Sequence, residues 1–176
     1  GKIGILPVQL APADIYPSLE RGTLDAVEYI GPYDDEKLGF SKVANNYYYP
    51  GFWDSCSCTT LFINKEQWEK LPPLYKAAIE ASAAEANNLL VARYDARNPP
   101  ALRRLLGAGV TLRAFPRDIM EASLKAAAEI YDELSQKSPA FATLFSDYNN
   151  YRNESAPWMR IAELSFDSMN LPAKIK

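Results

Sequence analysis

The sequence contains no histidine among its 176 residues. Histidine is the usual base that activates a serine or cysteine nucleophile, and it is the commonest metal ligand in proteins. Its absence excludes Ser-His and Cys-His catalysis and most zinc sites. Since no other pairing of nucleophile and base stands out, we predict that the protein is not an enzyme.

Positive charge and long apolar runs are also scarce. The chain has 19 Lys and Arg against 22 Asp and Glu, which gives a net charge of -3. Nucleic acids and anionic membranes bind basic surfaces, so neither is an expected partner. No apolar run reaches the ~18 residues of a membrane-spanning helix. No basic segment followed by an apolar one marks a secretory signal, so a chain complete as given would be cytoplasmic.

Cysteine is nearly absent, and the two that occur, Cys56 and Cys58, are separated by one residue. On a strand both side chains would point to the same face, which is poor geometry for a disulfide. A metal site would need further soft ligands, and the sequence has none. We interpret both cysteines as small, half-buried strand residues without a functional role.

The residues that are present describe an ordinary globular protein. Hydrophobic residues make up 48% and charged residues 23% of the chain, which is close to the average for soluble domains. This length can bury one substantial core. We predict a single α/β domain over residues 1–176, with a sheet in residues 1–71 and mainly helices in residues 72–176.

Short apolar or alternating segments predict the strands of this domain. The expected strands are Ile5–Leu10, Leu24–Ile30, Tyr47–Tyr49, Phe52–Ile63 and Val110–Phe115. We expect the first, second and last of these to lie in one parallel or mixed sheet.

Capping residues and apolar periodicity predict the helices. Asp14 is a candidate N-cap for a short helix that ends at Gly22, and Asn64 caps another. The longest helix begins at Pro72-Pro73. We expect Asn98-Pro99-Pro100 to break or kink it, because proline lacks an N–H donor and clashes with the preceding turn. The remaining expected helices begin after Pro32, Ala101, Asp118, Pro139 and Pro157.

The stretch from Arg21 to Asp35 contains the best candidate for a binding site. Glu28 interrupts the apolar face of a predicted strand, and Gly31-Pro32 ends that strand. Ligands of open α/β sheets bind at such carboxyl ends of strands, and a buried carboxylate there needs a cation. The alternative is that Glu28 and Asp54 are solvated at strand ends, with Asp25 equally available.

Four motifs of the chain resemble the DctP-like solute-binding proteins of TRAP transporters. Asp14–Gly22 is similar to the family pattern E-I-Y-x-A-L-x-R-G, and Asp25–Pro32 to D-A-x-E-W-x-G-P. Tyr49–Asp54 is similar to Y-P-G-W-W-E, and Asn64–Pro72 to N-K-x-x-W-x-x-L-P. The closest branch is the one that binds 2-oxo acids. The motifs cover nearly the whole chain in order, but only about the C-terminal half of a family member.

This resemblance implies a fold and a biological setting. The fold would be half of a periplasmic-binding-protein-like architecture, with a mixed sheet and long helices toward the C-terminus. The implied function is transport of small organic acids, such as 2-oxo or 2-hydroxy carboxylates, in the periplasm. The implied partners are a membrane permease and a second copy of the chain in a homodimer.

The resemblance also implies a metal-assisted site. In family members that bind these acids, Na⁺ or Ca²⁺ is shared by protein oxygens and the substrate carboxylate, and hard cations favour such ligands. Position by position, Glu28 would give a carboxylate, Tyr29 a backbone carbonyl, and Asp54 a carboxylate where the family has glutamate. Phe52 and Trp53 would wall the cleft.

The implied site is incomplete in this chain. The family arginine that pairs with the substrate carboxylate falls before residue 1, and Arg21 does not match it. We therefore expect the chain by itself to bind 2-oxo acids poorly. The alternative function is that of a truncated autonomous remnant, such as the product of a mobile gene, that acts through protein contacts. Apolar surface along Tyr47–Trp53 and Ala77–Leu90 would then favour self-association.

Overall fold

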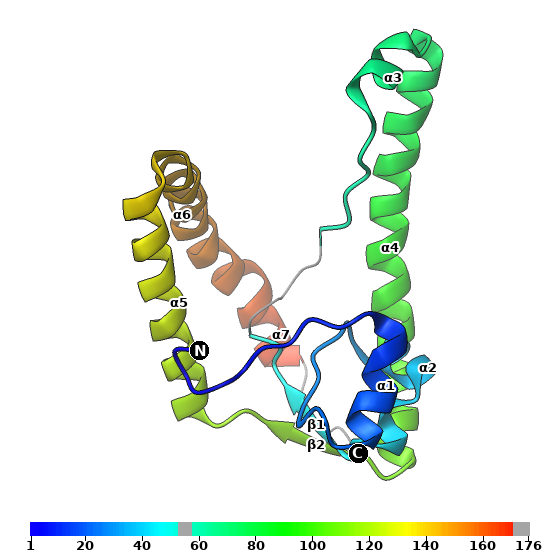
Figure 1. Cartoon of the computed structure of the whole chain (residues 1–176), viewed down its shortest axis with the longest axis vertical. Coiled ribbons are helices and arrows are strands. Elements are labelled where there is room, and N and C mark those ends of the chain that lie inside the picture. Colours follow the sequence, from blue (N-terminus) through cyan, green and yellow to red (C-terminus); the bar gives the residue numbers. More distant parts are fainter. Residues whose placement is uncertain (53–57, 171–176) are drawn as a thin grey trace. The chain divides into compact units, whose positions relative to one another are not determined.

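The structure, a computed structural model, describes residues 1–52 and 58–170. Trp53, Asp54 and Cys56 therefore lie outside the described residues. The chain divides into two compact units (Figure 1). One comprises Leu6–Pro116 and the other comprises Gly1–Ile5 with Arg117–Lys176.

In its described residues, the unit of residues 6–116 contains two strands and five helical segments. Its elements are α1 (Pro12–Glu20), α2 (Pro32–Leu38), η1 (Phe40–Lys42), β1 (Asn46–Tyr49), α3 (Lys65–Lys70), α4 (Pro73–Gly107) and β2 (Thr111–Ala114). The combination confirms the predicted α/β class. Asn64 caps α3 as predicted, since its side-chain oxygen accepts a hydrogen bond from the Gln67 N–H at 3.1 Å.

Strands β1 and β2 form a parallel two-stranded sheet. Asn46 is paired with Thr111, and Tyr49 with Ala114. A parallel pair needs a long crossover, and here it contains α3 and α4 (Figure 1). The strands predicted at Tyr47–Tyr49 and Val110–Phe115 are therefore confirmed, the second with slightly shorter bounds.

The strands predicted at Ile5–Leu10 and Leu24–Ile30 are wrong, since neither segment is part of a sheet. A strand requires a neighbour that pairs with its backbone, and the described residues supply none for them. The second segment uses its apolar side chains in another way. Leu24, Val27 and Tyr29 pack on the core formed by α1 and η1. The described end of the strand predicted at Phe52–Ile63 is also irregular, and Cys58 there is exposed rather than half-buried.

The core of this unit is small. Ile15, Leu19 and Phe40 form one buried cluster. Ala101 and Leu105 on α4 are also buried. Pro12 stands in the first turn of α1, where the missing N–H of proline costs nothing. The helix therefore begins at Pro12, and the prediction that Asp14 is its N-cap is wrong.

Helix α4 continues through Pro99 and Pro100, so the predicted break is absent. An interior proline costs a helix about 3 kcal/mol, and tertiary contacts of this segment offset that cost. Ala101 is fully buried. The Asn98 side-chain oxygen accepts a hydrogen bond from the Tyr33 N–H at 3.1 Å, which attaches α4 to the first turn of α2.

The second unit is built from helices. They are α5 (Arg117–Lys137), α6 (Pro139–Met159), the π-helical turn η2 (Arg160–Leu164) and α7 (Ser165–Asn170). Helices α5 and α6 pack through aromatic rings, with Tyr131 and Phe145 at 4.8 Å between centroids. The predicted helix start at Pro157 is wrong, because α6 continues through it. Lys2 forms ion pairs with Glu129 and Glu133 on α5.

Within the described ranges, none of the helices combines the length and the apolar character that crossing a bilayer requires.

Replacing Asn98 tests what holds α4 to α2. Asn98→Ala leaves the Tyr33 N–H without its acceptor, and we expect a loss of about 1–2 kcal/mol in the free energy of unfolding. Urea titration followed by circular dichroism measures it. Asn87→Ala, on an exposed part of the same helix, is the control and should be neutral or slightly stabilising because alanine favours helix. Equal effects of the two substitutions would contradict the assigned role of Asn98.

Candidate functional site

The carboxyl ends of the two strands lie at one edge of the sheet, because the strands are parallel. Phe52 follows β1 and Phe115 follows β2. Their rings meet edge to face at 5.1 Å, and Tyr48 contacts Phe115 at 5.0 Å. Phe52, predicted to wall a cleft, thus lies in an aromatic cluster beyond the strand ends, where α/β sheets bind ligands. Sequence reasoning missed Phe115, because its place beside Phe52 follows only from the pairing of β1 with β2.

Glu28 and Tyr29 lie on the loop between α1 and α2. Glu28 is exposed, and in the described part of the chain its carboxylate has no hydrogen bond or ion pair. Tyr29 is half-buried, and its ring meets Phe40 edge to face at 5.8 Å. Packing of this ring fixes the peptide next to Glu28. Asp25, the alternative candidate, is also exposed on this loop.

A partly buried hydrogen bond connects the segments that carry these residues. The Tyr47 hydroxyl on β1 donates to the Asp35 carboxylate on α2 at 2.5 Å. Tyr47 lies five positions before Phe52, and α2 follows directly after the loop of Glu28 and Tyr29. The bond therefore holds together the two segments that contain the predicted site residues.

The environment of this hydrogen bond shifts the pKa values of both groups that form it. Asp35 is only 8% exposed. Burial raises the pKa of its carboxyl above the ordinary value, although the Tyr47 hydroxyl and the backbone amides of Ile30 and Gly31 act in the opposite direction. Burial, and then the hydrogen bond to Asp35, also raise the pKa of Tyr47. The hydroxyl thus stays protonated and available as a donor.

The donors predicted for a metal ion are all oxygens, as hard cations prefer. Within residues 1–52 and 58–170, no group of three His, Cys, Asp or Glu residues is placed to hold a metal. Glu28 and the Tyr29 carbonyl are both in the described part, whereas Asp54 is outside it. Oxygen donors of this type suit Na⁺ or Ca²⁺, although the described residues gather no set of three such side chains.

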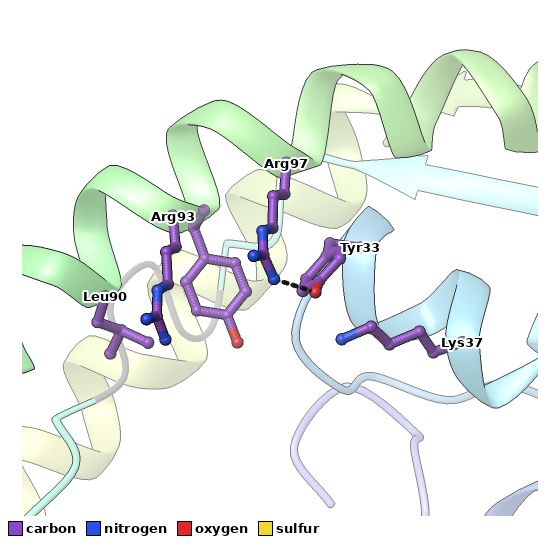
Figure 2. A pocket seen from close by; sticks show the side chains of 6 residues that line it. Tyr33, Lys37, Leu90, Arg93 and Arg97 are labelled. Carbon is purple, nitrogen blue, oxygen red and sulfur yellow. Dashed lines mark hydrogen bonds between the residues drawn. The ribbon is translucent and has the colours of Figure 1, made fainter.

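A separate hollow of about 230 Å³ lies between α2 and α4 (Figure 2). It is lined by Tyr33, Lys37, Leu90, Arg93, Tyr94 and Arg97. Arg97 donates a hydrogen bond to the Tyr33 hydroxyl, and the Tyr94 hydroxyl donates to Asp34 at 2.7 Å. Sequence reasoning missed this basic hollow, because its cations come from two helices about 60 residues apart.

Comparison with known proteins gives consistent relationships. Residues 1–138 match the family of bacterial extracellular solute-binding proteins, family 7 (DctP). A curated relative from Nostoc sp., described as a monocarboxylate 2-oxoacid-binding periplasmic protein, is 36% identical over 95% of this chain and 46% of its own length. The chain thus spans about half the length of the curated relative it matches.

Solved structures of TRAP solute-binding proteins have the same fold. One from Bordetella bronchiseptica has a TM-score of 0.92 and 46% identity, and the match covers 96% of this chain and 50% of the Bordetella chain. That protein is described as a mixed occupancy dimer with copurified calcium and picolinate. One from Pseudoalteromonas atlantica, with bound sodium and pyruvate, has a TM-score of 0.86 and 25% identity over 94% of this chain and 50% of its own.

Changing pH should expose the energetic cost of burying Asp35. Its raised pKa means that its contribution to stability is fully present below the unfolded-state value and is lost as pH rises through the folded-state value. Asparagine accepts the same hydrogen bond but cannot ionise. We expect the stability of Asp35→Asn relative to the wild type to rise as pH increases from about 3.5 to about 7, because only the wild-type carboxyl must ionise in a buried place.

Urea unfolding across this pH range measures the effect. Asp132→Asn, at an exposed position of α5, controls for the general effect of removing a carboxylate. If the stability curves of the wild type and Asp35→Asn ran parallel, burial would not be what perturbs Asp35.

Proposed function

The chain belongs to the bacterial extracellular solute-binding proteins of family 7, the DctP family, and from this premise we propose that it forms part of a TRAP-type binding protein for small 2-oxo carboxylates. The family consists of solute-binding transport proteins rather than enzymes. The supporting observation is the Tyr47–Asp35 hydrogen bond, which joins the loop of Glu28 to the segment of Phe52 in one unit.

In the proposed site, Na⁺ or Ca²⁺ supplies positive charge for the substrate carboxylate. Glu28 offers a side-chain oxygen, Tyr29 its backbone carbonyl, and Asp54 a second carboxylate. Phe52 and Trp53 present aromatic surface that keeps water from the ligand. These roles fit an anionic substrate, because two carboxylates would repel it unless a cation lay between them. They also agree with the metal and small acid described for the Bordetella and Pseudoalteromonas proteins.

We further propose that this chain is the C-terminal half of a two-lobe binding protein. Its coverage of about half of its relatives supports a half, and the resemblance of its motifs implies which half. In that arrangement the other lobe supplies the remaining ligands, including the arginine that the family uses for the substrate carboxylate. The proposed location is the periplasm, as for the Nostoc relative, and the proposed partner is a membrane permease.

A second candidate function is contact with other protein, including a second copy of this chain. Large apolar side chains are exposed in the unit of residues 6–116, among them Phe62 at 89% and Leu74 at 75%. On α4, Leu89, Leu90 and Val91 are exposed as well. Such surface generally finds a partner. The Bordetella protein is described as a dimer, which supports a homodimer.

Substituting Glu28 tests the carboxylate site. In the gene product at its natural length, Glu28→Gln removes the charge that balances the cation, and we expect at least about tenfold weaker binding of pyruvate in Ca²⁺ or Na⁺. Isothermal titration calorimetry measures it. Glu20→Gln, at the exposed end of α1, makes the same change outside the site and should bind normally. Unaltered affinity of Glu28→Gln would remove Glu28 from the site.

Light scattering of the 176-residue chain tests self-association. We expect a mass of two chains at micromolar concentration. Ala81 and Glu80 are adjacent and exposed on α4. Ala81→Glu places a charge in the Ala77–Leu90 surface and should shift the mass toward one chain, whereas Glu80→Ala should not. A mass of one chain that does not grow with concentration would contradict the homodimer.

A further inference from the structure

We infer that the hollow between α2 and α4 binds a small multivalent oxyanion, such as a dicarboxylate or phosphate. Below, the hollow means the space lined by the six residues of Figure 2. This site is distinct from the proposed substrate site in its residues and in its chemistry. It uses cationic side chains of the protein itself, whereas the substrate site is proposed to depend on a bound metal.

The charge balance of the hollow favours an anion. Lys37, Arg93 and Arg97 bring three positive charges to it, and Asp34 is the nearby carboxylate. Both oxygens of Asp34 are engaged, one by the Tyr94 hydroxyl at 2.7 Å and the other by Lys37 at 3.7 Å. In the described part of the chain, neither Arg93 nor Arg97 has a carboxylate partner. Two guanidinium groups therefore remain without a counter-charge.

The positions of the cations also favour binding of an anion. The Lys37 ammonium lies 3.5 Å from the centroid of the Tyr33 ring, and the Arg97 guanidinium lies 5.0 Å from it. Cations this close to one ring gain from its π-electrons but repel each other. They lower the pKa of Tyr33, Lys37 first and Arg97 after it. A bound oxyanion would relieve this repulsion and accept the bidentate hydrogen bonds that guanidinium groups offer.

The size of the hollow suits a small ligand. Its volume of about 230 Å³ corresponds to several water molecules at ~30 Å³ each, enough for phosphate or a short dicarboxylate. Its two walls are attached to each other outside the hollow. Asn98 accepts from the Tyr33 N–H, and Arg104 forms two hydrogen bonds of 2.6 Å to Glu36. The two helices that carry the cations are therefore held together before a ligand arrives, so binding does not have to bring the helices together.

The probes are malonate and inorganic phosphate, added to the ¹⁵N-labelled 176-residue chain in metal-free buffer. We expect the amide signals of Arg93, Tyr94 and Lys37 to shift with saturation at millimolar concentration. Arg93→Gln and Lys37→Gln should each weaken binding about tenfold, since each removes a charge-assisted contact. Arg103→Gln is the matched control, because Arg103 is exposed on α4 and does not line the hollow.

The outcomes separate this site from the proposed function. Glu28→Gln should leave the malonate response unchanged, even if it abolishes binding of pyruvate. Absence of saturable shifts at these amides, or equal affinity of Arg93→Gln and Arg103→Gln, would overturn the oxyanion site. Shifts by a hexaglutamate peptide, without shifts by malonate or phosphate, would also overturn it and would assign the hollow to an acidic segment of a protein.

Discussion

The hydrogen bond between Tyr47 and Asp35 is the contact on which the arrangement of the candidate site depends. It joins α2 to β1 at 2.5 Å in a partly buried place, where Asp35 itself is buried. Without it, Asp35 would be a carboxylate that has lost its water and gained too little in return. The same bond fixes the end of the loop of Glu28 in space relative to the start of the segment that leads to Phe52. A polar interaction thus adds to the small apolar core in positioning these residues.

Helix α4 completes this framework. Its buried residues, Ala101 and Leu105, lie after the two prolines, and its side chain at Asn98 reaches the first turn of α2. The prolines are tolerated because the segment around them is anchored at one residue by a hydrogen bond and at the next turn by burial. Since α2 is attached to both β1 and α4, it connects the loop of Glu28, which precedes it, to the basic hollow, which its residues Tyr33 and Lys37 line.

Local signals in the sequence predicted much of this fold. Asn64 and Gln67 predicted the cap of α3, and β-prone tyrosines predicted β1, because both depend on residues close in the chain. The apolar segments Ile5–Leu10 and Leu24–Ile30 were misassigned, because strand formation depends on a pairing neighbour that a local pattern does not reveal. The break predicted at Pro99 and Pro100 of α4 was wrong for a similar reason. Their local penalty is real, but tertiary packing decides the outcome.

The residues of the candidate site fall into the same two groups: those that a local pattern identified and those that depend on distant segments. Motif resemblance identified Glu28, Tyr29 and Phe52, and the structure places Glu28 and Tyr29 on an open loop and Phe52 among aromatic rings. The roles of all five residues remain proposals, and Trp53 and Asp54 also lie outside the described residues. Phe115 and the basic hollow were not predicted, since each arises where residues from distant segments meet. No pattern in one segment reports the charge that another segment will bring beside it.

The two proposed sites handle an anion by opposite means. Around Glu28 the protein contributes carboxylates, so a carboxylate ligand is attracted only where a cation reverses the local charge. Between α2 and α4 the protein contributes ammonium and guanidinium groups, and Asp34 is already engaged by Tyr94 and Lys37. The overall charge of -3 therefore says little about either site. What decides anion binding is which carboxylates are already neutralised by neighbours, and this depends on side-chain contacts between helices rather than on composition.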